Sequence, residues 1–123
     1  MKKLLVYFLL LILSTILLVG CSENSRNYMT GIYLRSTNGS DIIVSDDSAT
    51  TVMSNKTGDE NIFDDLKSGD KIEIIYDSIM ETYPSKTQIY SCKLIERGSI
   101  DNIPKDVLDK LQEMGWTFDL ENL

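Results

Sequence analysis

Apolar residues are distributed along this chain in two different ways. From Leu4 to Leu18 they form one run, interrupted only by Ser14 and Thr15. Beyond Asn27 they recur at every second position over short segments, which is the spacing that buries one face of a β-strand. Near the C-terminus the spacing changes to three and four residues, as on one side of a helix. The pattern predicts an apolar leader, a mainly β domain and a C-terminal amphipathic helix.

The alternating segments define the expected strands, which cover residues 30–35, 41–45, 50–54, 71–76 and 88–96. The first two strands are joined through Asn38 and Gly39. An Asn-Gly pair between apolar runs favours a tight hairpin, because both residues accept a positive φ. Segment 59–66 has its apolar residues at helical spacing and predicts one or two helical turns between the third and fourth strands.

The C-terminal helix is expected to carry one apolar stripe. The stripe consists of Ile103, Val107, Leu108, Leu111 and Met114, with Pro104 in the first turn. Gly115 follows at the position where a left-handed residue ends many helices, so Trp116 is expected to fold back on Leu111. We expect this stripe to dock on the strands and to bury Leu108 and Leu111.

The N-terminal run has the features of a lipoprotein export signal. Lys2 and Lys3 precede the apolar run, which ends in Leu18-Val19-Gly20-Cys21, the residue order of a lipobox. Diacylglycerol is attached to such a cysteine through a thioether, and cleavage before the cysteine then exposes its amine. We therefore expect residues 1–20 to be a signal peptide, 21–27 a lipid-anchored polar tether and 28–123 a single domain.

An uncleaved membrane helix is the alternative interpretation of the N-terminal run. A bilayer span needs about 20 apolar residues, whereas this run is slightly shorter and no stop-transfer charges follow it. We therefore expect acylated Cys21 to anchor the protein to the membrane, with its domain on the extracytoplasmic face of the cell membrane.

The charge of the chain excludes one class of partner. Removal of residues 1–20 takes away Lys2 and Lys3, so the formal net charge changes from −7 to −9. No basic stripe with interleaved aromatic residues is present, and an acidic surface repels phosphate backbones. We therefore expect no nucleic-acid partner.

Catalytic chemistry has little support in the sequence. The chain has no histidine, and once Cys21 is acylated Cys92 is the only free thiol, within the strand expected at 88–96. Segments 68–71 and 56–58 imitate the S-x-x-K and K-T-G motifs of penicillin-binding enzymes, but in reversed order. Pairs of acidic residues occur without a calcium-loop pattern. We expect no enzyme activity, no metal and no cofactor.

Two short motifs resemble a known family. They are LKSGDKIEIIYD at residues 66–77 and IMETYP at residues 79–84. The chain resembles the YobA-type family of small lipoproteins from low-GC Gram-positive bacteria, in which a Gly-Asp-Lys-like turn opens a strand and a Glu-Ser-Tyr-Pro-like element precedes the next. Thr82 stands at the Ser position here. The resemblance covers about residues 28–97, implies a small OB-like antiparallel β-barrel with the helix outside it, and brings no known activity.

Two tyrosines are candidates for a ligand-binding surface, because OB-like barrels bind ligands on a strand face through aromatic side chains. Tyr33 is expected to face away from Ile32 and Leu34, and Tyr83 lies beside a proline in a connection, so both are expected to be exposed. A non-catalytic module that binds an extracytoplasmic protein, peptide or glycan is the favoured function. An inhibitor or immunity-type lipoprotein that blocks a secreted protein is the alternative, and an enzyme comes third.

Overall fold

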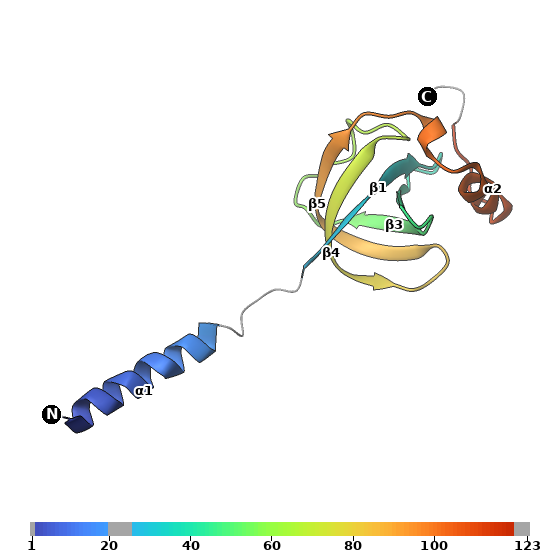
Figure 1. The fold of residues 1–123 in the computed structure, drawn as a ribbon. Helices are drawn as coiled ribbons and strands as arrows, with labels where there is room; N and C mark the ends of the chain where they lie inside the picture. Colours follow the sequence, from blue (N-terminus) through green and yellow to red (C-terminus); the bar gives the residue numbers. More distant parts are fainter. Residues whose placement is uncertain (1, 20–25, 120–123) are drawn as a thin grey trace.

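Five strands close into one barrel. The computed structural model describes residues 2–19 and 26–119. The elements in chain order are α1 (Lys2–Val19), β1 (Asn27–Arg35), β2 (Asp41–Ser45), β3 (Thr50–Asn55), β4 (Lys71–Met80), β5 (Ser85–Glu96), a 3-10 turn (Ile100–Asn102) and α2 (Lys105–Glu113) (Figure 1). The barrel order is β1-β2-β3-β5-β4, and β4 returns to pair with β1.

The strand pairings confirm the predicted fold class and add one feature to it. Neighbouring strands are antiparallel except β3 and β5, which run parallel with Val52 opposite Lys86. A five-stranded closed barrel with these connections is OB-like. The structure is therefore a mainly β, OB-like barrel with a C-terminal helix, as predicted, but it is not antiparallel throughout.

The barrel interior is filled by one apolar cluster. Its buried members are Tyr33, Ile43, Met53, Phe63, Leu66, Ile72, Ile74 and Ile89. Phe63 and Leu66 come from the connection between β3 and β4, where helical turns were predicted. The structure has consecutive turns there instead of a helix, and in the last of them the Leu66 N–H donates to the Phe63 carbonyl at 3.1 Å. A segment this short closes too few i to i−4 hydrogen bonds to offset helix nucleation.

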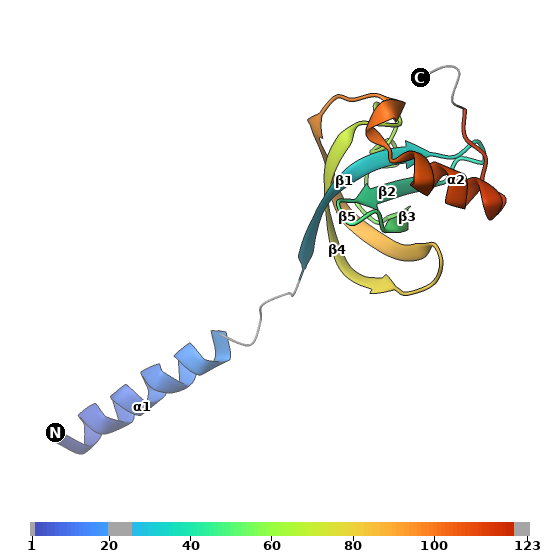
Figure 2. The same cartoon turned by 45° about the vertical axis from the view of Figure 1, so that its right-hand side comes forward.

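A second apolar cluster lies outside the barrel, between the sheet and α2. Its buried members are Leu34, Ile42, Val44, Ile103, Val107 and Leu111. Figure 2 shows α2 lying across the outer side of β1 and β2. Successive side chains of β2 alternate between the two clusters, Ile43 inward and Ile42 and Val44 outward. Strand β2 is therefore buried on both faces.

The end of α2 confirms the predicted capping. Gly115 has φ +96°, the Trp116 N–H donates to the Leu111 carbonyl at 3.0 Å, and the Gly115 N–H donates to the Gln112 carbonyl at 3.0 Å. These are the two hydrogen bonds of a Schellman motif. Trp116 packs against the outer cluster, and Leu111 is 1% exposed, whereas Leu108 is only half-buried.

The N-terminal helix α1 carries exposed apolar side chains from Leu4 to Leu11. Among residues 2–19 and 26–119, no helix combines the length and apolar character needed to cross a membrane. The predicted lipidation residue Cys21 lies outside the described residues, as does most of the predicted tether.

Candidate functional site

The strand face at which OB-like barrels commonly bind ligands is covered in this chain. That face spans strands 2 and 3 of the barrel. Here Ile42 and Val44 of β2 pack against Val107 and Leu111 of α2. A ligand cannot contact this part of the sheet while α2 is docked, so a binding site has to be formed elsewhere on the domain.

The predicted exposure of Tyr33 is wrong. Tyr33 does point away from Ile32 and Leu34, but those two side chains face outward toward α2, so the opposite direction is the barrel interior. Tyr33 is 0% exposed. It is therefore not part of an exposed binding surface.

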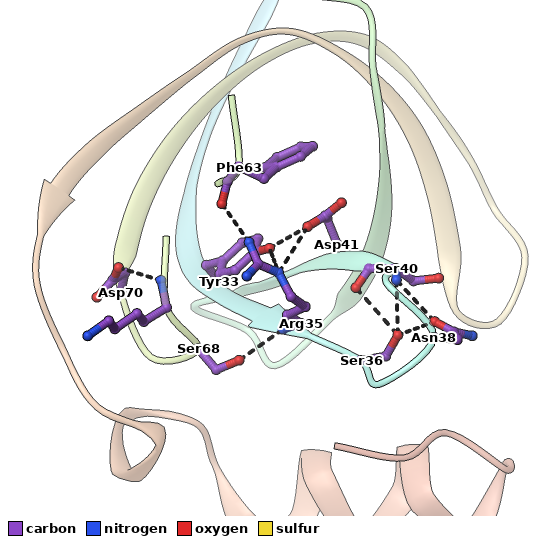
Figure 3. Close-up of polar contacts among 10 residues, drawn as sticks. Tyr33, Arg35, Ser36, Asn38, Ser40, Asp41, Phe63, Ser68 and Asp70 are labelled. Atoms are coloured by element: carbon purple, nitrogen blue, oxygen red, sulfur yellow. Dashed lines mark hydrogen bonds and ion pairs between the residues drawn. The ribbon is translucent and has the colours of Figure 1, made fainter. Parts of the chain in front are cut away.

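Tyr33 belongs instead to a polar network at one end of the barrel (Figure 3). Its hydroxyl donates to Asp41 Oδ1 and accepts a hydrogen bond from Arg35 Nε at 2.8 Å. Arg35 Nη2 donates to the Phe63 carbonyl at 2.5 Å. Burial raises the pKa of Tyr33 well above its ordinary value, and burial also raises the pKa of Asp41 against the opposing effects of Tyr33 and Arg35. The network joins β1, β2 and the connection before β4.

Cys92 is half-buried and packs against the interior cluster. Burial, with a smaller contribution from the charge of Asp41, raises the pKa of its thiol to about 11. The thiol is therefore protonated at neutral pH, whereas nucleophilic chemistry needs the thiolate. No group of three or more side chains suited to hold a metal ion occurs among the residues that the structure describes.

Tyr83 is exposed, as predicted. It lies in the connection between β4 and β5, immediately before the cis residue Pro84, and the residue is 58% exposed. The ammonium group of Lys110 in α2 lies 4.7 Å from the centre of the Tyr83 ring. A hydrogen bond with Tyr83 raises the pKa of Lys110. Tyr83 is thus in contact with α2.

A cavity of about 360 Å³, the Tyr83 cavity, lies between the β2–β3 turn, the start of β5 and α2. It is lined by Asp47, Ser48, Ala49, Thr50, Tyr83, Ser85, Asp106, Val107, Lys110 and Leu111. Hydrogen bonds from Ser45 and from the Ala49 N–H lower the pKa of Asp47, so its carboxylate is charged at neutral pH. The lining therefore presents an aromatic ring, carboxylates, an ammonium group and hydroxyls.

A second cavity, of about 500 Å³, lies at the barrel end that contains the Tyr33 network; we call it the mouth cavity. It is lined by Arg35, Ser36, Thr37, Leu66, Lys67, Ser68 and Asp119. No sequence pattern predicts this cavity, because its residues come from three separated segments and none belongs to a motif that signals binding.

One family model matches most of this chain, from the end of α1 through the whole barrel. Residues 15–96 match the family described as "Protein of unknown function (DUF3221)". The chain belongs to this family. The match ends at Glu96, the last residue of β5, so α2 lies outside the DUF3221 region. The YobA-type resemblance predicted from residues 66–84 is confirmed.

One solved structure is similar to this DUF3221 chain. It is the crystal structure of a YobA protein from Bacillus subtilis subsp. subtilis str. 168, with 18% identity and a TM-score of 0.49, covering 60% of this chain and 99% of that chain. No curated protein matches the chain.

The Tyr83 cavity combines residues from inside and outside the DUF3221 region. Asp47 and Tyr83 lie within the matched residues, whereas Asp106 and Lys110 belong to α2. The cavity therefore exists only where α2 is docked on the DUF3221 barrel.

Proposed function

We propose that this chain is a lipoprotein, anchored to the extracytoplasmic face of the membrane through Cys21, that acts as a non-catalytic binding module for a peptide or glycan. The observation that carries the proposal is the Tyr83 cavity. Three separate elements position an exposed aromatic ring beside carboxylates and an ammonium group.

The lining of the Tyr83 cavity suits a neutral ligand rich in hydroxyl or amide groups. An aromatic ring offers a flat apolar contact, while carboxylates accept and ammonium groups donate hydrogen bonds. Asp47 and Asp106 disfavour a phosphate backbone, in agreement with the acidic net charge of the chain. Peptides and glycans have the required mixture of groups.

The electrostatics of the reactive side chains support binding rather than catalysis. The raised pKa values keep Cys92 as a thiol and Lys110 as an ammonium ion, so neither is prepared to act as a nucleophile or base. Asp41 is engaged by Tyr33 within the barrel-end network. Each group is more readily explained by packing or ligand contact than by turnover.

Replacing Tyr83 by alanine is expected to weaken ligand binding at least about thirtyfold, because truncating a central tyrosine of a binding site costs about 2 kcal/mol or more. Calorimetry of the full chain in detergent with soluble cell-wall glycopeptide fragments measures the effect. Tyr28→Ala is the matched control, since Tyr28 is 68% exposed and lies outside the cavity.

Equal binding by the Tyr83→Ala and Tyr28→Ala variants would contradict the assignment of the cavity. Hydrolysis of the fragments by the wild-type chain would contradict the non-catalytic assignment. A third outcome would favour the inhibitor function instead. In that outcome the chain binds no fragment but binds one secreted protein at a one-to-one ratio, and the binding is lost in Tyr83→Ala.

Replacing Cys21 by alanine is expected to abolish lipid attachment, because the lipobox places the acylated thioether at this residue. Labelled palmitate should enter the wild-type chain and not the Cys21→Ala variant. The control is Cys92→Ala, which removes the other cysteine and should label like the wild type. Equal labelling of both variants, or an intact Met1 N-terminus on the membrane-bound protein, would refute the anchor.

A further inference from the structure

The mouth cavity is a separate site with chemistry of its own. Its lining contains two cationic side chains, Arg35 and Lys67, and one acidic side chain, Asp119. The chain as a whole carries a formal net charge of −7. The lining therefore carries one more positive than negative side chain, and Asp41, whose Oδ1 lies 3.8 Å from Arg35 Nε, partly balances the charge of Arg35. We propose that the mouth cavity binds a carboxylate group carried by a peptide.

Arg35 is fixed in place before any ligand arrives. Its Nε donates to the Tyr33 hydroxyl and its Nη2 donates to the Phe63 carbonyl. The guanidinium group has five N–H donors, and these two hydrogen bonds use only part of them. A side chain held by the barrel-end network loses little conformational entropy when its other donors bind a ligand.

Ser68 supplies a buried hydroxyl at the same cavity. Ser68 is 5% exposed, and its Oγ accepts a hydrogen bond from the Arg35 backbone N–H at 3.0 Å. Because the oxygen already accepts, the hydroxyl proton is the part suited to donate to a ligand. Asp70 Oδ2 accepts the Lys67 N–H at 2.8 Å and holds the turn that presents Lys67. The lining from β1 and this turn is therefore rich in donors.

The shape of these donors and the position of Asp119 favour a carboxylate. A planar guanidinium group pairs with the two oxygens of a carboxylate through parallel N–H donors. The Thr37 N–H donates to the Thr117 carbonyl at 2.9 Å, so the segment after α2 runs along the cavity and adds Asp119 to its lining. The chain itself thus places a peptide-borne carboxylate at this position.

The test uses the full chain in detergent with N-acetylglycine as the carboxylate probe, and N-acetylglycinamide and inorganic phosphate as comparison probes. Backbone amide shifts of Thr37, Lys67 and Ser68 in NMR titrations report binding. N-acetylglycine is expected to bind most tightly. Lys67→Gln should weaken it about tenfold, the usual contribution of a charged hydrogen bond. Asp119→Asn should tighten it severalfold, because a like charge is removed.

Lys93→Gln is the matched control, because Lys93 is exposed on β5 and lies outside the cavity. It should bind N-acetylglycine as the wild type does. The proposal is overturned if the amide probe or phosphate binds as tightly as N-acetylglycine, or if Lys67→Gln and Lys93→Gln bind it equally. It is also overturned if Asp119→Asn weakens binding. Lys67 is exposed, so its replacement leaves the fold intact for this comparison.

Discussion

Replacement of Leu111 by alanine is expected to lower the free energy of unfolding by about 2 to 5 kcal/mol, the range for deleting a buried leucine side chain. Leu111 is 1% exposed and contacts the outer faces of the strands through the second apolar cluster. The substitution leaves a cavity between α2 and the barrel, which the rigid sheet cannot fill. Urea unfolding followed by circular dichroism measures the change.

Two neighbouring positions of α2 serve as comparisons for Leu111. Gln112→Ala alters an exposed side chain and should change stability little, while Leu108→Ala should have an intermediate effect because Leu108 is half-buried. If Leu111→Ala unfolds at the same urea concentration as Gln112→Ala, the docking of α2 on the barrel is wrong.

Replacement of Asp70 by asparagine is expected to lower the free energy of unfolding by about 1.5 to 3 kcal/mol, the range for hydrogen bonds to a charged group. Asp70 is 1% exposed. Its carboxylate accepts the N–H groups of Lys67 at 2.8 Å and Gly98 at 3.0 Å, and Arg97 Nη1 at 2.9 Å. An amide has only one acceptor oxygen, so its NH2 group would face the donors that the second carboxylate oxygen accepted. Urea unfolding at pH 7 measures the loss.

Acid unfolding gives a second measure of the same side chain. Burial alone would raise the pKa of Asp70, but the hydrogen bonds from Lys67, Gly98 and Arg97 outweigh it, and the pKa is lowered. The lowered pKa stabilises the folded state fully above the pKa of an aspartate in the unfolded chain, about 3.9. This contribution is lost as the pH falls through the lower pKa of Asp70 in the folded state. The wild type should therefore lose stability on acidification below about pH 4 more steeply than Asp70→Asn. Asp109→Asn, an exposed substitution in α2, should follow the wild type.

Strand positions were predictable from the sequence where apolar and polar residues alternate without interruption. Segment 41–45 was predicted with the bounds that β2 has in the structure. Strands β4 and β5 are longer than predicted, because register shifts near Tyr76 and Ile79 interrupt the alternation that marks a strand. The Schellman ending at Gly115 was predictable because it depends only on local backbone conformation.

The binding surface was less predictable, because it depends on how the elements pack. Alternation assigned Tyr33 to the face opposite Leu34, but both faces of β1 are buried, so alternation could not show which one is interior. The exposure of Tyr83 followed from its place in a connection beside Pro84. The mouth cavity brings together Arg35, Lys67 and Asp119 from distant parts of the sequence. Their proximity depends on closure of the barrel and on the path of the segment after α2, and no local sequence pattern predicts either.

The position of α2 has a thermodynamic consequence for the two cavities. Lys110 of α2 borders the Tyr83 cavity, and Asp119, just beyond α2, borders the mouth cavity. A ligand that binds the Tyr83 cavity only in the docked form stabilises that form by mass action. A carboxylate in the mouth cavity is repelled by Asp119, which the segment after α2 brings to that cavity, so it is expected to weaken docking instead. Because occupancy of one site lowers the population that the other favours, the two sites are expected to show negative cooperativity without sharing a contact. Slower hydrogen exchange at the backbone amides of Val107 and Leu111 would report the filling of the Tyr83 cavity.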